Sequence, residues 1–176
     1  SGTQYTPEKG WDENKLDFFR RHIVQLGRSG LFVVYDELVG KEPVEWNYLL
    51  HTVELPMEVA EEKDGLRILG KNKADGVSIA HLFSSQKMTY AQTDTFFVAA
   101  VDWKKRLGKT LSNHYHFTAT TASCSKICFL NVIDVNGHKR ADDVINRERN
   151  RITVEEWVIE CNLEGEGNAF LYIENK

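Results

Sequence analysis

The chain has 176 residues, of which 41% are hydrophobic and 27% are charged, and its formal net charge at pH 7 is −4. This length suits one domain with a substantial core, and the composition is that of an ordinary globular protein. The acidic balance argues against general binding to nucleic acid or anionic membranes, and no apolar run approaches the roughly 18 residues that a membrane-spanning helix needs.

Strand patterns dominate the chain from its beginning. The chain starts with SGTQYTPEKGW, and its first methionine is Met57, so we expect a processed or excised piece of a longer protein. The apolar pattern then predicts strands at 15–26, 31–38, 44–55, 66–70, 77–83, 95–103, 114–121, 126–135, 152–163 and 168–174. GRSG (27–30) and GKEP (40–43) have the composition of turns, and Asp75-Gly76 predicts a hairpin.

Two charge-rich stretches interrupt this series, EVAEEKDG at 58–65 and HKRADDVINRERNR at 138–151. We expect both to be loops, with room for one helical turn each. About ten short strands without a sustained helical period indicate an all-β fold, an antiparallel β-sandwich, with residues 1–176 as a single domain.

The chain has three cysteines, Cys124, Cys128 and Cys161. This small, odd number does not suit a disulfide framework. Cys124 and Cys128 would lie about 13 Å apart on one extended strand, too far to bridge each other. Either could meet Cys161 if their strands are neighbours. The sequence favours three half-buried thiols.

The stretch NHYHFTATT (113–121) carries a possible metal site, because His114 and His116 share one face of a predicted strand. Cupins follow such a pair with a glutamate three or four residues later, but here no carboxylate occurs before Asp134. A further ligand would have to come from a distant strand, such as His51 or His81. The favoured interpretation places Tyr115, Phe117 and Ala119 in the core, turns the histidines outward and assigns no metal to this chain.

A basic segment beside an aromatic ring is the candidate binding site. WKKRLGK (103–109) suits an acidic glycan, because ammonium and guanidinium groups pair with carboxylates and sulfates while the ring stacks on a sugar. The alternative is a solvated loop. The candidate substrate-binding residues are Trp103, Lys104, Lys105, Arg106 and Lys109.

Catalytic patterns are weak throughout, and we assign no catalytic residue. The paired carboxylates at 61–62 and 142–143 lie in charged stretches, and Glu155 and Glu156 point to opposite faces of a strand. No nucleophile elbow is present. Elimination on a uronic acid needs a base and a group that neutralises the carboxylate. Residues of a suitable type are Tyr48, His51, His81 and Tyr115, but their spacing in the sequence does not bring a base and a neutralising group together.

Two stretches together resemble the β-sandwich region of the heparinase II/III-like polysaccharide lyases. In residues 18–56, Arg20 or Arg21 precedes an apolar strand ending in Asp36, a turn with Pro43, and an aromatic strand that ends in Leu50-His51. Residues 113–135 resemble the aromatic-histidine strand and the following Phe-Leu-x-Val strand of the same region.

This resemblance implies a parent enzyme in which an α/α toroid packs on the sandwich and cleaves uronate-containing glycans, such as heparan sulfate or alginate, by elimination. Its sandwich metal motif needs an aspartate where this chain has Thr118 and lies upstream of the matched stretch, so no catalytic or metal residue is carried over. The expected role is that of a C-terminal domain, inactive alone, in a periplasmic or secreted lyase. Its expected partners are an acidic polysaccharide and the α/α domain of the same chain, with no nucleic acid and no membrane; any metal belongs to the parent. A free-standing carbohydrate-binding module and a small cupin-like metalloprotein using His114 and His116 remain open.

Overall fold

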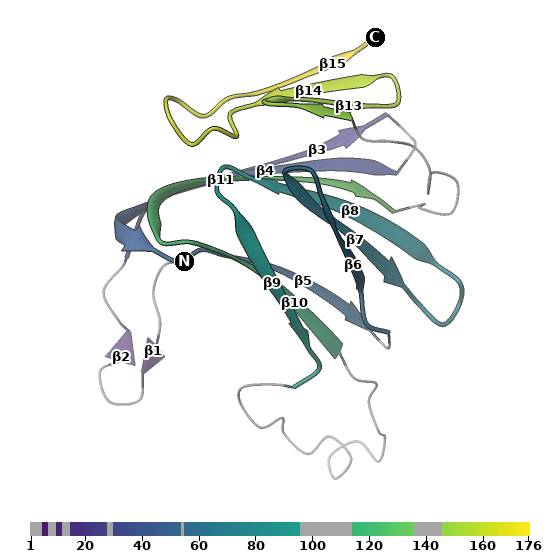
Figure 1. Ribbon diagram of the computed structural model, residues 1–176, viewed down its shortest axis with the longest axis horizontal. Helices are drawn as coiled ribbons and strands as arrows, with labels where there is room; N and C mark the ends of the chain where they lie inside the picture. Colours follow the sequence, from purple (N-terminus) through teal and green to yellow (C-terminus); the bar gives the residue numbers. More distant parts are fainter. Residues whose placement is uncertain are drawn as a thin grey trace.

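The computed structural model describes residues 5–6, 10–11, 15–27, 30–53, 55–95, 114–135 and 146–176. Every regular element in these residues is a β strand (Figure 1), and every strand pair is antiparallel. The predicted all-β antiparallel class is therefore confirmed. No described segment forms a helix with the length and apolarity that crossing a membrane requires.

A six-stranded sheet forms the middle of the molecule. Its order is β3-β4-β11-β8-β7-β6, so β11, from the second half of the chain, lies between β4 and β8 from the first half. The longest members, β3, β4 and β11, pair along most of their length. The six strands are β3 (Leu16–Leu26), β4 (Leu31–Val44), β11 (Cys124–Asp134), β8 (Val77–Ser84), β7 (Gly65–Lys71) and β6 (Glu58–Glu62).

A three-stranded sheet covers one face of this sheet, in the order β5 (Asn47–Val53), β10 (His114–Thr121) and β9 (Met88–Thr93). The chain turns a corner between the two sheets at Trp46. The backbone N–H of Trp46 donates to Thr121 Oγ1 at 3.3 Å, and its indole N–H donates to the carbonyl of Cys124 at 2.9 Å. These bonds fix the bend where β4 continues into β5 and β10 into β11.

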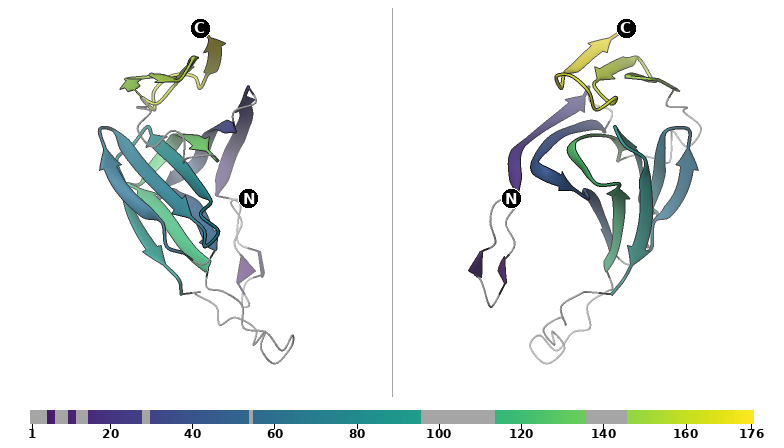
Figure 2. Two further views of the ribbon diagram at one scale, coloured as in Figure 1. Left: turned by 90° about the vertical axis from the view of Figure 1, so that its right-hand side faces the viewer. Right: turned by 60° about the vertical axis from the view of Figure 1, so that its left-hand side comes forward.

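A four-stranded sheet packs on the opposite face and is the upper layer in Figures 1 and 2. Its order follows the sequence: β12 (Asn146–Glu148), β13 (Arg151–Val154), β14 (Trp157–Cys161) and β15 (Leu171–Asn175). A separate short pair joins β1 (Tyr5–Thr6) to β2 (Gly10–Trp11). The three larger sheets make a layered sandwich rather than a simple two-sheet one.

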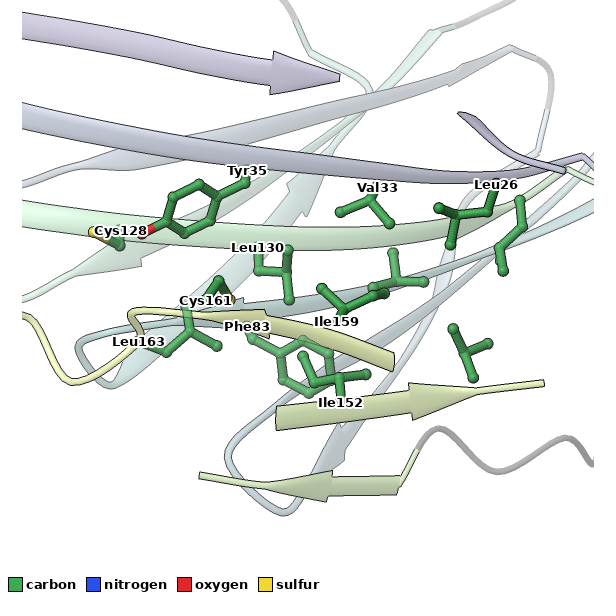
Figure 3. Packing of buried hydrophobic residues seen from close by; sticks show 13 residues of the cluster. Leu26, Val33, Tyr35, Phe83, Cys128, Leu130, Ile152, Ile159, Cys161 and Leu163 are labelled. Atoms are coloured by element: carbon green, nitrogen blue, oxygen red, sulfur yellow. The ribbon is translucent and has the colours of Figure 1, made fainter. Parts of the chain in front are cut away.

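Two apolar clusters hold the three layers together, one on each face of the six-stranded sheet. Alternate residues of β11 serve the two clusters: Cys128, Leu130 and Val132 face the four-stranded sheet, whereas Ile127 and Phe129 face the three-stranded sheet. Figure 3 shows the first cluster, in which Tyr35 also donates to the carbonyl of Asn162 at 3.1 Å. A strand buried on both faces explains the near-continuous apolar run in the sequence.

The two charge-rich stretches are corrected by the structure. Residues 58–65 include β6, which pairs with β7 at the edge of the six-stranded sheet, and Asp64 takes a positive φ of 67° in the turn between them. The described part of 138–151 includes β12, which leads through Arg149, with φ 54°, into β13. Both are edge strands with little apolar burial, so they lack the alternation on which strand prediction depends.

The three cysteines are all free, and they differ in how deeply they are buried. Cys128 and Cys161 are fully buried in one cluster, and burial raises the pKa of Cys161 to about 12 and also raises that of Cys128. Only Cys124 is half-buried as predicted.

A thiol reagent at pH 8 is therefore expected to modify Cys124 in the folded protein. It should reach the other two cysteines at least about 100-fold more slowly, through unfolding. Cys124→Ser should abolish the fast phase; a fast phase that persists in this variant would contradict the burial pattern.

Candidate functional site

The predicted glycan-binding loop cannot be placed. Trp103, Lys104, Lys105, Arg106 and Lys109 belong to 96–113, outside the described residues. The same holds for Asp142 and Asp143 of the carboxylate pairs. The basic loop stays a prediction.

The histidine pair of β10 lies on the outer side of the three-stranded sheet. Phe117 and Ala119 are fully buried toward the six-stranded sheet, whereas His114 is exposed and His116 is half-buried on the other face. Of the two distant histidines considered as partners, His51 lies opposite His116 on β5, with 4.5 Å between ring centroids. His81 lies in a different sheet, on β8. Within the described part of the chain, no three His, Cys, Asp or Glu side chains gather to hold a metal.

The tyrosine and histidine candidates for elimination chemistry are not brought together. Tyr48 is buried on the inner face of β5, and three residues later His51 lies on the outer face. Tyr48 Oη accepts a hydrogen bond from Asn131 Nδ2 at 3.1 Å, and burial raises the pKa of the phenol. This phenol stays protonated at neutral pH and is not a ready base.

A pocket of about 460 Å³ opens where the β6–β7 turn, the β8–β9 turn and β12 meet. Arg147 forms one wall: its guanidinium lies 5.1 Å from the Phe83 ring centroid, and it donates to the carbonyls of Asp64 at 2.5 Å and Arg149 at 2.9 Å. Burial lowers the pKa of Arg147, but the group remains charged. Sequence reasoning missed this residue, because it lies in a stretch whose composition shows only many charges.

The charge balance of this pocket does not suit a uronate chain. Glu61, Glu62 and Asp64 line it together with Arg147 and Lys87. Its serines are engaged in the turn, since Ser84 Oγ donates to the carbonyl of Gln86 at 2.8 Å and Ser85 Oγ accepts from the backbone N–H of Cys128 at 3.0 Å. The pocket therefore presents neither an activated nucleophile nor an excess of positive charge.

Beside this pocket, His81 Nδ1 lies 3.1 Å from Glu62 Oε2, while Arg67 and Asp134 also act on the ring electrostatically. Burial lowers the pKa of His81, against the opposing effect of Glu62. A base whose folded-state pKa lies below its unfolded value of about 6.5 binds its proton better when unfolded. Stability is therefore full above about pH 6.5 and falls as the pH drops below that value.

We expect His81→Gln to weaken the loss of stability between pH 7 and pH 5, because glutamine stays neutral there. The contribution of one proton is at most about 1.4 kcal/mol per pH unit. Urea unfolding at several pH values measures it, with the exposed His22→Gln as the matched control. A pH dependence unchanged in His81→Gln would show that this ring does not titrate as its burial implies.

Two phenylalanines are followed by two arginines, Phe18 to Arg21, along β3, the edge strand beside β4. Arg21 makes two hydrogen bonds to Asp36, Nε to Oδ1 at 2.6 Å and an Nη to Oδ2 at 2.7 Å, and lies 5.6 Å from the Phe19 ring centroid. On the opposite face Arg20 donates to Glu37 at 2.8 Å. Both arginines are thus neutralised by carboxylates of β4 and are not free to bind an anion.

Apolar side chains remain exposed along the same strand. Phe18 is 40% exposed, Phe19 46% and Ile23 66%. An eleven-residue edge strand that pairs with β4 alone among the described strands, and that carries exposed rings, is unusual in a protein that works alone. Phe19 and Ile23 share one face of β3, and Phe18 lies on the other. These three exposed apolar residues along the edge strand, the β3 strip, are the described feature best suited to contact another protein part.

Distant neighbours of this layered antiparallel β protein occur among solved structures. No protein-family profile matches the chain, and no curated protein matches it. Among solved structures, a protein described as a heparinase III gene product matches with 12% sequence identity and a TM-score of 0.43. The alignment covers 93% of this chain and 26% of that protein, so the chain spans about a quarter of its length.

Proposed function

We propose that this chain is a supporting β domain of an exported polysaccharide lyase that acts on uronate-containing glycans, and that it is not catalytic alone. The observation that carries the proposal is the β3 strip, whose exposed apolar side chains need a cover. The proposed cover is the α/α catalytic domain of the same parent protein. The resemblance of residues 18–56 and 113–135 to the lyase sandwich supports this choice.

The chemistry of the described residues fits a supporting role. Tyr48 and His51 lie on opposite faces of β5, and the pocket at Arg147 is lined by more carboxylates than cations. An elimination site requires a base and a positive group beside the same substrate carboxylate. In the described part of the chain, Arg67 is the cross-strand neighbour of His81, but Glu62 lies 3.1 Å from the same ring and offsets this positive charge. The proposed active site therefore lies in the other domain.

The β3 strip fits a domain interface rather than a glycan site. The neighbouring Arg20 and Arg21 are held by Glu37 and Asp36, so docking here would contact rings and aliphatic carbons beside charges that are already paired. Interfaces between domains of one chain combine such apolar centres with polar surroundings. A uronate chain would instead need cations that are free to pair with its carboxylates.

The first experiment measures the unsaturated uronate product by absorbance when the chain alone is mixed with heparan sulfate or alginate. We expect no turnover; turnover by the chain alone would overturn the supporting role. Affinity for the same glycans, measured in parallel, would favour the carbohydrate-binding module instead, and Trp103→Ala with Lys104→Ala would locate it at the basic loop.

The second experiment places a charge in the proposed interface of the full-length parent lyase. Ile23→Lys is expected to lower lyase activity at least about tenfold by separating the domains, because a charge would have to be buried. Tyr172→Lys is the matched control, since Tyr172 is 53% exposed on β15, in a different sheet. Equal activity of the two variants would contradict an interface at β3.

A further inference from the structure

Three histidines lie on the outer face of the three-stranded sheet. His114 and His116 alternate along β10 with Tyr115 and Phe117, which pack inward, and His51 occupies the outer face of β5. His51 is exposed, so solvent and dissolved ions reach this face. The register places His51 directly opposite His116, and His114 opposite Val53.

The cross-strand pair is closer than the pair along the strand. Residues directly opposite in an antiparallel sheet have Cβ atoms about 4.5–5.5 Å apart. His114 and His116, two residues apart on one strand, are separated by about 7 Å along it. The ring centroids of His51 and His116 lie 4.5 Å apart, with an angle of 70° between the ring planes.

This spacing matches two imidazoles on adjacent positions of one metal ion. With metal–nitrogen bonds of about 2.0 Å at a right angle, the centres of two coordinated rings lie about 4.5 Å apart. A tetrahedral angle would place them about 5 Å apart. Imidazole ligands at right angles are typical of tetragonal Cu²⁺, which also binds nitrogen ligands more tightly than other divalent first-row metals.

We propose that His51 and His116 form a two-imidazole binding site for Cu²⁺. The other coordination positions are assigned to water, which reaches the pair from the side of the exposed His51. Thr93 is the register neighbour of His116 on β9, so the row across the three strands reads Thr93, His116, His51 and contains no acidic side chain. The site differs from the cupin-like alternative in pairing His116 with His51 across two strands and not with His114 along one. It is independent of the proposed supporting function.

The test uses the complete chain without a histidine tag, stripped of metal with a chelator and titrated with Cu²⁺. Electron paramagnetic resonance is expected to show nitrogen ligands on one bound ion per chain. His51→Ala, at an exposed position that should not affect folding, is expected to weaken binding at least about tenfold. His116→Gln should weaken it similarly, and circular dichroism checks that this half-buried position still folds.

Two control variants make the assignment specific. His22→Ala, on β3, and His114→Ala, on the same face as the pair, are expected to change the affinity less than about threefold. The proposal is overturned if His51→Ala binds Cu²⁺ as the wild type does, or if His114→Ala loses as much affinity as His51→Ala. The second result would return the ligands to the pair along β10.

Discussion

Phe117→Ala is expected to lower the free energy of unfolding by about 3–5 kcal/mol. Phe117 is completely buried at the centre of β10, where β5 and β9 flank it, and its ring stacks with Tyr90 at 6.0 Å between centroids. Its cluster joins the three-stranded to the six-stranded sheet, and the neighbours cannot collapse into the lost volume without moving a strand. Because domains are commonly stable by about 5–15 kcal/mol, this single change removes a large share of the total.

Urea unfolding followed by circular dichroism measures this loss. The matched control is Phe170→Ala, since Phe170 is 49% exposed and its truncation is expected to cost less than about 1 kcal/mol. If both variants lose the same stability, the inward face of β10 is misassigned. A register shifted by one residue would bury His116 in place of Phe117.

Alternation within single strands could be predicted from sequence. The run HYHFT has rings inward at Tyr115 and Phe117 and histidines outward, and Asp75-Gly76 closes a hairpin in which Asn72 Oδ1 accepts from the N–H groups of residues 74 and 76. Both features depend on neighbours within a few residues. Local patterns therefore predict the strands that bury one or both faces and some of the turns, but not the edge strands β6 and β12.

Pairings between distant strands could not be predicted in the same way. The layer formed by β12 to β15 depends on Asn150, whose side chain accepts from the backbone N–H of Leu163 at 2.8 Å and whose carbonyl accepts from that of Cys161 at 3.0 Å. Nothing in a charged stretch identifies one asparagine as this link. Likewise, His51 and His116 are 65 residues apart in the sequence (116 − 51), and only the register of β5 and β10 brings them into contact.

The candidate site shows the same division. Arg20 or Arg21 followed by Asp36 could be recognised as a pattern, but which arginine pairs with which carboxylate depends on the irregularity between Leu16 and Phe18 in the pairing of β3 with β4. That register places Arg21 opposite Asp36 and Arg20 opposite Glu37. The pocket wall at Arg147 could not be predicted, because Asp64 and Phe83 meet it only in the folded chain.

Arg21→Ala is expected to cost about 2–3 kcal/mol of stability, far more than the same change at its neighbour. The side chain of Asp36 is only 3% exposed, so removing the guanidinium leaves a buried carboxylate without its two hydrogen bonds. Breaking a fully buried pair typically costs about 3–5 kcal/mol. The smaller value reflects Arg21 itself, which is 46% exposed and partly screened by solvent.

Arg20→Ala provides the matched control one residue away. Arg20 makes one bond to Glu37, which also lies 3.3 Å from Lys126 and so keeps a cationic partner, and we expect a loss below about 1 kcal/mol. Adding Asp36→Asn to Arg21→Ala should restore at least half of the lost stability, because the neutral amide carries no charge that burial opposes. If the double variant is no more stable than Arg21→Ala, the cost arises from lost packing against Phe19. The unpaired Asp36 carboxylate would then not be the cause of the lost stability.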